Sequence, residues 1–170
     1  MAGRGSRFSS AGFKIPKPFI DISGKPMAIQ SANSNPISEK YIFVTLKDHI
    51  KNYSLKYYLN KEYTNYKIIP IPNITEGQAI TCKKGISELN ENHSLLIVAS
   101  DNAVIYDNNK YQNLISDKTI DGIIFTFRNH ISSRKNPDMF GWVKLDECGN
   151  AIEVSVKKPI SKTTLNSITK

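Results

Sequence analysis

The first residues of the chain combine glycines with a cationic side chain, a pattern suited to holding phosphate groups. Gly3, Gly5, Ser6 and Arg7 lie in the opening segment MAGRGSRF. Glycines let backbone amides approach a phosphate closely, and an arginine adds a forked hydrogen-bond donor. The spacing matches neither the Walker loop, whose lysine follows a longer gap, nor the dinucleotide fingerprint, which has a third glycine. Gly/Ser/Arg stretches also occur in disordered tails, so this segment by itself leaves both interpretations open.

A lysine enclosed by prolines follows shortly afterwards. Lys17 lies between Pro16 and Pro18 in KIPKPFIDISGKPM. Because prolines restrict the backbone on both sides, they fix the direction in which the lysine side chain leaves the chain. An exposed turn lysine is one interpretation of this pattern. A lysine held near an arginine-bearing loop, where it would bind phosphates, is the other.

A carboxylate follows the most apolar segment of the sequence. Asp101 comes just after 94–99 (SLLIVA), which we expect to form a strand covered on both faces. The carboxyl end of a parallel strand is where open α/β sheets bind ligands. Mg²⁺ prefers one or two carboxylates plus phosphate oxygens, so Asp101 is a candidate metal ligand. The alternative is that Asp101 caps the next helix.

These residues need a scaffold, and the apolar pattern predicts an α/β fold with a mostly parallel sheet and helices on both faces. We expect strands at 41–46, 67–71, 94–99 and 122–127, helices at 48–63, 75–89 and 110–115, and an antiparallel hairpin from 142–145 and 152–156. Thr75 and Gln78 have capping-box spacing, which predicts that a helix begins there. No repeat or long linker interrupts the pattern, so we expect one domain over residues 1–170.

The composition limits the class of protein. With 39% hydrophobic and 22% charged residues, and no apolar run long enough to span a membrane, we expect a cytoplasmic chain without a membrane partner. The cysteines, Cys82 and Cys148, lack metal-site spacing. A net charge of +8 suits nucleic acid or small polyanions. Because the lysines are dispersed and do not alternate with aromatic residues, we expect no nucleic-acid partner.

Several segments together resemble the sugar-phosphate nucleotidylyltransferases, a GT-A-like family that makes NDP-sugars. The family signature is a loop A-G-x-G-[ST]-R followed by P-K-P or P-K-x-L. This chain has, in the family's order, AGRGSRF, PKPFIDISGKPM, TEGQAITC, VASDNAV and MFGWVKLDECGNAIEVSVKKP. The resemblance implies a Rossmann-like fold, a nucleoside triphosphate substrate and Mg²⁺. It also implies a reaction in which a phosphate oxygen of a second substrate attacks the α-phosphorus and pyrophosphate leaves.

The resemblance also assigns roles to residues. Arg7 and Lys17 would be catalytic and Asp101 would bind the metal. The nucleotide-binding residues would be Ala2, Gly3, Gly5, Ser6 and Gly77.

The second substrate would lie against Gly141, Lys157 and Lys158. Hexose-using members of the family often have Glu where this chain has Lys157, which indicates a substrate with a second phosphate or a carboxylate. The motifs AGRGSRF and PKPFIDISGKPM are most similar to those of the CTP:phosphoglutamine cytidylyltransferases of bacterial capsule synthesis. This resemblance implies CTP and a phosphorylated small molecule as substrates. A hexose-1-phosphate nucleotidylyltransferase is the alternative. The sequence also allows a homo-oligomer.

Both ends of the chain differ from the family pattern. Relatives have an apolar strand before the glycine-rich loop, whereas this chain starts inside the loop. After Ile160 the segment SKTTLNSITK is polar and unpatterned, whereas relatives continue with elements that carry a second metal-binding carboxylate. We therefore expect a domain truncated at both ends. A fragment, a misassigned start and an inactive nucleotide-binding remnant remain alternatives.

Overall fold

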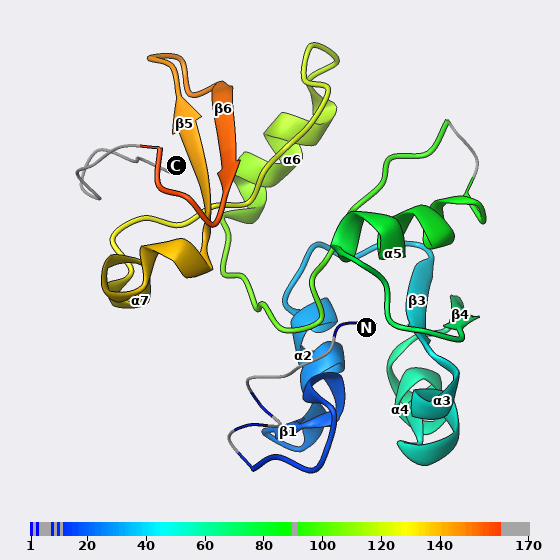
Figure 1. Ribbon diagram of the computed structural model, residues 1–170. Helices are drawn as coiled ribbons and strands as arrows, with labels where there is room; N and C mark the ends of the chain where they lie inside the picture. The colour runs from blue at the N-terminus through cyan, green and yellow to red at the C-terminus, as the bar shows by residue number, and fades with distance from the viewer. Residues whose placement is uncertain (2, 4–7, 9, 11, 90–91, 161–170) are drawn as a thin grey trace. The chain divides into compact units, whose positions relative to one another are not determined.

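The computed structural model describes residues 1, 3, 8, 10, 12–89 and 92–160 (Figure 1). The chain divides into two compact units, Met1–Tyr106 and Asp107–Lys170, and each is described by itself.

The described residues form short helices and two-stranded sheets. Unit 1 contains η1 (Lys17–Phe19), β1 (Asp21–Ile22), β2 (Lys25–Pro26), α2 (Met27–Asn33), β3 (Tyr41–Leu46), α3 (Lys47–Asn52), α4 (Leu55–Glu62), β4 (Tyr66–Ile71) and α5 (Gln78–Ile86). Unit 2 contains α6 (Asn108–Ser116), α7 (Ile131–Lys135), η2 (Pro137–Met139), β5 (Gly141–Leu145) and β6 (Ala151–Val156). Strands β1 and β2 pair antiparallel, β3 and β4 pair parallel, and β5 and β6 pair antiparallel.

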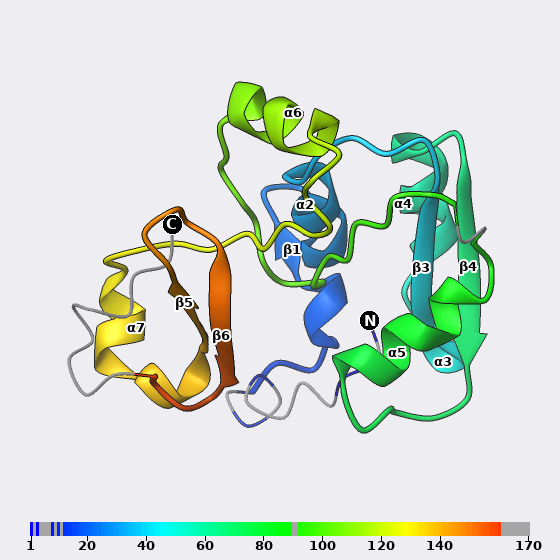
Figure 2. The same ribbon diagram turned by 90° about the horizontal axis from the view of Figure 1, so that it is seen from above.

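The parallel pair β3–β4 is the centre of unit 1. Because successive side chains of a strand point to opposite faces, β3 presents Phe43 to one side and Val44 to the other. Phe43 belongs to the same buried cluster as Leu59 of α4. On the other face, a Cβ added to Gly85 of α5 would lie 3.2 Å from Val44 Cγ2, so this helix approaches the sheet closely. Helices therefore cover both faces of the pair, as the sequence predicts (Figure 2).

One buried cluster fixes the elements that carry the candidate site. It consists of Phe19, Ile29, Phe43, Leu55, Leu59 and Tyr63. Ile29 and Leu59 are 0% exposed, and burying an aliphatic side chain of this size contributes about 1.5–3 kcal/mol. The cluster joins η1, α2, β3 and α4. Phe19, two residues after Lys17, is buried in this cluster and thereby fixes the backbone at Lys17.

The sheet is smaller than the sequence predicts. The segments 94–99 and 122–127 are not strands, so the only parallel pairing among the described residues joins β3 to β4. Leu95 and Ile97 are 48% and 52% exposed, whereas the sequence predicts a strand covered on both faces. The physical reason is that a strand requires a neighbouring backbone for its ladder, and apolar composition does not supply that neighbour.

Two predicted helices also differ in the structure. The expected helix over 48–63 is two helices, α3 and α4, because Ser54 has a left-handed backbone with φ 48°. The expected start at Thr75 is wrong: α5 begins at Gln78, and Gly77 is its N-cap without a side-chain cap bond. The Thr75 hydroxyl instead donates to the Gly77 carbonyl at 3.2 Å.

Unit 2 contains the expected helix and hairpin. Helix α6 is capped by Asp107, whose carboxylate accepts a hydrogen bond from the Lys110 amide at 3.1 Å. Strands β5 and β6 enclose a turn in which the Asp146 carboxylate accepts a hydrogen bond from the Asn150 amide at 2.8 Å. Gly149, with φ 91°, supplies the left-handed backbone that this turn requires.

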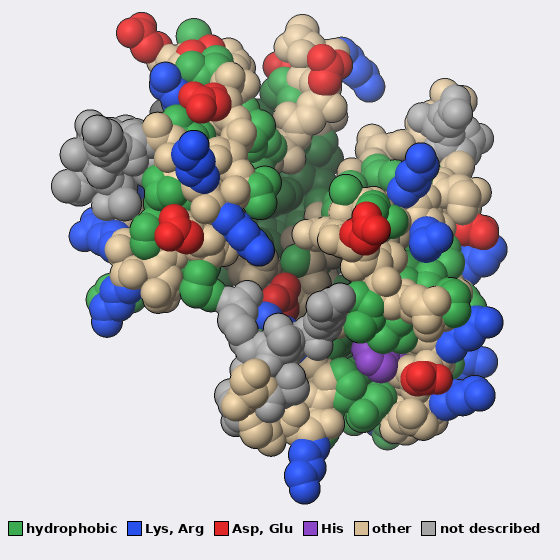
Figure 3. Space-filling model, viewed as in Figure 1, with side chains coloured by type: hydrophobic (Ala, Val, Ile, Leu, Met, Phe, Trp, Pro, Cys, Tyr) green, Lys and Arg blue, Asp and Glu red, His purple; other side chains and the backbone are tan. Residues whose placement is uncertain are grey.

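Two surface properties bear on the expected partners. Among the described residues, no helix has the length and apolarity needed to cross a membrane. On the face shown in Figure 3, Lys and Arg side chains are scattered among acidic and polar ones over each unit.

Candidate functional site

Two of the predicted site residues meet in unit 1. The Lys17 ammonium donates to Asp101 Oδ2 and forms an ion pair with it, although 84 residues separate the two in the chain. Their side chains are 24% and 31% exposed, so both are accessible from solvent. The pair places a cation, which could bind an anionic ligand, next to a carboxylate, which could bind a metal ion, although in this structure the two side chains bind each other.

The prolines position Lys17 as the sequence predicts. Lys17 begins the 3-10 helix η1, with Pro16 as its N-cap and Pro18 within it. Pro18 and Phe19 are buried, and the Phe19 ring stacks on Tyr53 with 4.9 Å between ring centroids. The side chain of Lys17 therefore leaves a backbone that packing and proline rings both restrict.

An aromatic residue from the glycine-rich segment also contacts Lys17. The Lys17 ammonium lies 4.7 Å from the centroid of the Phe8 ring, which is cation–π geometry. Phe8 directly follows Arg7 in the sequence.

Asp101 lies in a turn, and it does not belong to a larger group of metal-ligating side chains among the described residues. No group of three or more His, Cys, Asp or Glu side chains in the described part of the chain is placed to hold a metal. A small number of carboxylates binds Mg²⁺ tightly where a nucleotide supplies most of the remaining oxygen ligands, which is the usual mode for this ion. The donor set thus suits a metal that arrives with a triphosphate.

The start of the chain lies close to the same carboxylate. The Met1 amino group donates to the Val44 carbonyl of β3 at 2.8 Å. Burial lowers the pKa of this amino group, while the nearby Cys82 of α5 and Asp101 act to raise it. The Val44 carbonyl of β3, Cys82 of α5 and the turn that contains Asp101 therefore all lie near the Met1 amino group in unit 1.

Gly77 is the N-cap of α5, the helix that contains Cys82. Its φ of −177° is extended backbone that any residue adopts, and an added Cβ would meet no atom of the described residues within 4 Å. Neither the local backbone nor a neighbouring protein atom therefore requires glycine at this position. This leaves room for a ligand beside Gly77.

In unit 2 the structure brings together the residues expected to bind the second substrate. Gly141 pairs with Val156 at the open end of the β5–β6 hairpin, and the Lys157 amide donates to the Phe140 carbonyl at 3.0 Å. Lys157 has a left-handed backbone with φ 59°, which is uncommon for a residue with a side chain. Lys158 follows directly, so two lysines come immediately after Val156, the residue that pairs with Gly141.

Four predicted nucleotide-site residues, Ala2, Gly5, Ser6 and Arg7, lie outside the described residues. Gly3 is described and exposed.

Two further residues, Phe8 and Ser31, contact this site and were not predicted from the sequence. Phe8 is the aromatic neighbour of Lys17. Its position immediately after Arg7 is the sequence feature that could have indicated this contact. Ser31 lies on α2 and its hydroxyl contacts the turn that contains Asp101. The sequence feature that could have indicated this role is a small polar residue on the apolar side of the short helix MAIQSAN, where a buried hydroxyl needs a hydrogen-bond partner.

Comparisons with known proteins show the family of the chain and a similar fold. The sequence matches the family model described as Nucleotidyl transferase over residues 1–169, so the chain belongs to the nucleotidyl transferase family. Its fold is similar to the crystal structure of a nucleoside-diphosphate-sugar pyrophosphorylase from Vibrio cholerae RC9, with a TM-score of 0.55 and 17% identity. The match covers 95% of this chain and 66% of that one, so the chain spans slightly less than two thirds of that structure. A search of curated proteins found no match.

Proposed function

We propose that this chain is the nucleotide-binding part of an enzyme that transfers a nucleoside monophosphate to a phosphorylated small molecule. The proposed donor is CTP and the proposed acceptor is a compound such as L-glutamine phosphate, with a role in bacterial capsular polysaccharide synthesis. The observation that supports the reaction class is the contact between Lys17 and Asp101, because it joins two motifs that lie far apart in the sequence. Membership of the nucleotidyl transferase family agrees with it.

The proposed reaction is an in-line displacement at phosphorus. An oxygen of the acceptor phosphate bonds to the α-phosphorus, and the bond from that phosphorus to the oxygen bridging to the β-phosphate breaks, so pyrophosphate leaves. Such reactions are accelerated mainly by positioning and by neutralising charge. Lys17 would contact the α-phosphate and the incoming phosphate, Arg7 would neutralise the triphosphate, and Gly3, with Ala2, Gly5 and Ser6, would offer backbone amides to it.

Asp101 would hold Mg²⁺ together with phosphate oxygens, and the bound ion would supply charge neutralisation at the triphosphate. For this to happen Lys17 must leave the Asp101 carboxylate. The incoming phosphates give Lys17 a replacement anionic partner, so the ion pair seen in the structure is exchanged for two new contacts. Gly77 would lie against the base or ribose, since no other part of the described chain comes within 4 Å of the position of its Cβ.

The acceptor would bind at the β5–β6 hairpin. Gly141 permits close approach, and Lys157 and Lys158 offer charge to an acceptor that carries a phosphate and a further anionic group. The left-handed backbone at Lys157 supports this role, because such conformations concentrate at functional sites.

The test is a pyrophosphate-release assay on the purified 170-residue chain. CTP, UTP, ATP, GTP and dTTP are each combined with Mg²⁺ and with L-glutamine phosphate or glucose 1-phosphate. We expect release with CTP and the glutamine derivative. Equilibrium binding of Mg-CTP without any product would instead favour a nucleotide-binding remnant, and absence of binding by all five nucleotides would contradict the proposal.

A hexose-1-phosphate nucleotidylyltransferase is the second candidate. The name of the similar structure, a nucleoside-diphosphate-sugar pyrophosphorylase, favours it. Lys157 weighs against it, since a cation replaces the acceptor that would bind sugar hydroxyls. Turnover with glucose 1-phosphate and none with L-glutamine phosphate would decide for this candidate.

A further inference from the structure

The buried hydroxyl of Ser31 contacts the backbone on both sides of Asp101. Ser31 Oγ lies 2.6 Å from the Ala99 carbonyl oxygen and 2.6 Å from the Asn102 carbonyl oxygen. Ser31 is 2% exposed and lies 68 and 71 residues from these partners in the chain. A hydroxyl has one proton, so it donates to one carbonyl at a time. Its position nevertheless draws together the two ends of the turn that presents Asp101.

A second hydroxyl of the same helix holds the chain just after this turn. Ser34 Oγ accepts a hydrogen bond from the Val104 amide at 3.1 Å and donates to the Ser31 carbonyl at 2.8 Å. Segment 94–99, which precedes Asp101, is not a strand. The backbone around Asp101 is therefore held by side chains of α2 rather than by a sheet ladder.

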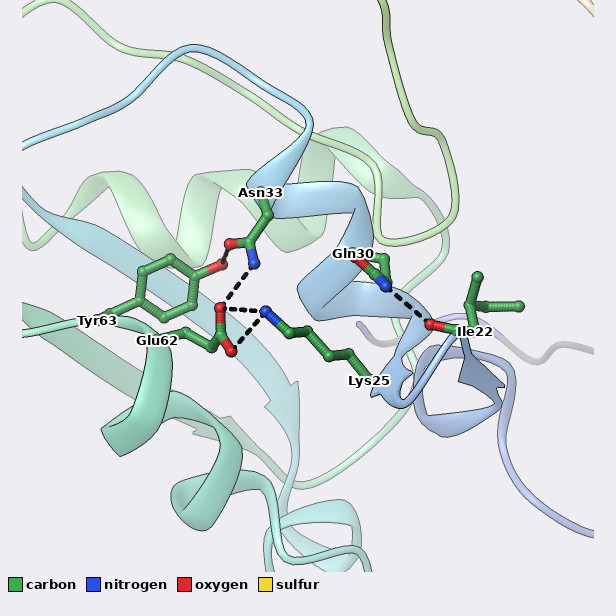
Figure 4. A network of polar contacts seen from close by, with 6 residues as sticks. All are labelled: Ile22, Lys25, Gln30, Asn33, Glu62 and Tyr63. Atoms are coloured by element: carbon green, nitrogen blue, oxygen red, sulfur yellow. Dashed lines mark hydrogen bonds and ion pairs between the residues drawn. The ribbon is translucent and has the colours of Figure 1, made fainter.

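Helix α2 is itself firmly fixed in unit 1. Its Ile29 is 0% exposed and lies in the main buried cluster. Figure 4 shows the polar side of the same helix: Asn33 donates to Glu62 of α4 at 2.8 Å, and Tyr63 donates to Asn33 at 2.7 Å. Lys25 of β2 donates to the same Glu62 carboxylate at 2.8 Å. The turn that contains Asp101 is thus hydrogen-bonded to a helix that is itself held in place by contacts on both its apolar and its polar side.

We propose that Ser31 is a positioning residue that holds Asp101 where the carboxylate can bind a metal together with a nucleotide. Ser31 acts through the turn backbone and does not itself touch the ligand. The inference rests on the proposed function, because it takes Asp101 to be the metal-binding carboxylate. Removal of groups that orient a metal ligand typically lowers metal affinity about 10- to 100-fold.

The experiment measures nucleotide binding at equilibrium rather than activity. The probe is whichever of CTP, UTP, ATP, GTP and dTTP binds the wild-type chain most tightly, and Mg²⁺ is titrated. For Ser31→Ala we expect the Mg²⁺ concentration at half-maximal binding to rise about tenfold or more. Nucleotide binding without divalent metal should not change, because Lys17 and the glycine-rich segment remain. Amide hydrogen exchange at residues 100–104 should become faster in the same variant.

The matched control is Ile29→Val, which trims the apolar side of the same helix without touching the turn. It should leave the Mg²⁺ dependence unchanged, although it lowers the stability of the fold. An equal shift in Ile29→Val and Ser31→Ala would show a general effect of helix stability and would overturn the positioning role.

The remaining outcomes separate the two proposals. Wild-type Mg²⁺ dependence in Ser31→Ala, with Asp101→Asn still impaired, overturns the role of Ser31 alone. If nucleotide binding by the wild-type chain does not depend on Mg²⁺, the metal role of Asp101 is overturned and this inference with it. Should Ser31→Ala not fold, Ser34→Ala provides the second variant. It should shift the Mg²⁺ dependence in the same direction, and wild-type behaviour in it would contradict the inference.

Discussion

The Lys17 ammonium and the Asp101 carboxylate form an ion pair that joins η1 to the turn after segment 94–99. Each is the charged residue of a separate sequence motif, and each is expected to bind part of the same metal–triphosphate ligand. In the structure they neutralise one another. Each side chain therefore occupies the position that the other's proposed ligand would take. Substituting each residue in turn tests its proposed role in binding.

Removal of the carboxylate should abolish metal-dependent turnover. In Asp101→Asn we expect the rate of pyrophosphate release to fall about a hundredfold or more, because one strong metal contact is lost. The fold should survive with a change of less than about 1 kcal/mol, since the lost ion pair is partly exposed. The control is Asp107→Asn, in which asparagine caps α6 about as well as the aspartate that now accepts from the Lys110 amide. Full Mg²⁺-dependent activity in Asp101→Asn would contradict the metal assignment.

Removal of the lysine should have opposite effects on metal and on nucleotide. In Lys17→Met the Asp101 carboxylate loses its competing cation, so Mn²⁺ binding without nucleotide should tighten. A partly exposed ion pair contributes about 0.2–1 kcal/mol, which corresponds to a change of roughly 1.4- to 5-fold. Nucleotide binding should weaken in the same variant.

Electron paramagnetic resonance of free Mn²⁺ measures the first effect. Lys25→Met is the matched control, because Lys25 pairs with Glu62 and not with Asp101. Weaker Mn²⁺ binding in Lys17→Met than in the wild-type chain would show that the two side chains do not compete.

A methyl group at Gly77 should impair nucleotide binding without affecting the fold. Among the described residues an added Cβ meets no atom within 4 Å, and the backbone is in an ordinary extended conformation. In Gly77→Ala we expect little net change in thermal unfolding, because alanine is a poorer N-cap than glycine but lowers the entropy of the unfolded chain. Nucleotide binding should weaken about tenfold, or about 1.4 kcal/mol. Gly122→Ala, also free of contacts within 4 Å, is the control and should bind normally. Normal binding by Gly77→Ala would place the nucleotide elsewhere.

The anionic acceptor predicts a specific effect at Lys157. Asparagine tolerates the left-handed backbone better than lysine, so Lys157→Asn removes the charge without adding strain. We expect unchanged or slightly higher stability and about tenfold higher KM for L-glutamine phosphate, with a smaller change for CTP. Steady-state kinetics with each substrate varied in turn measures this difference. Equal changes in both KM values would argue against a role specific to the acceptor.

Acid should weaken the network around Glu62. Hydrogen bonds from Lys25 and then Asn33 hold the pKa of the Glu62 carboxyl below its ordinary value of 4.5. Because the folded-state pKa is the lower one, this stabilisation is fully present above the ordinary value and is lost as the pH falls through the folded-state pKa. At neutral pH we expect Glu62→Gln to unfold about 1 kcal/mol more easily, a difference that shrinks below about pH 4.

Chemical denaturation between pH 3 and 7 measures the effect. The companion variant is Tyr63→Phe, which removes the hydrogen bond from the Tyr63 hydroxyl to Asn33. Burial raises the pKa of that hydroxyl, so it stays protonated throughout the range and its contribution should not depend on pH. A constant difference for Glu62→Gln across the same range would contradict the assigned cause.

The sequence by itself determined the local elements and the chemical character of the site. The strand 41–46 coincides with β3, and the hairpin enclosing DECGNA is present, because alternation and turn residues act over a few neighbouring positions. The rigid setting of Lys17 was also predictable, since prolines act on adjacent residues. The motif order indicated the nucleotidyl transferase family, which the family model confirms.

Only the tertiary structure decided how these elements are combined. The apolar segment 94–99 is not a strand, because a strand depends on a neighbour that local sequence does not specify. The single expected helix over 48–63 is divided at Ser54, where two helices pack separately into the core. The contact between Lys17 and Asp101, and the hold of Ser31 on the turn beside it, join residues about 70 to 84 positions apart. Such contacts arise when the buried cluster brings η1, α2 and the turn together, because no local preference of the chain encodes them.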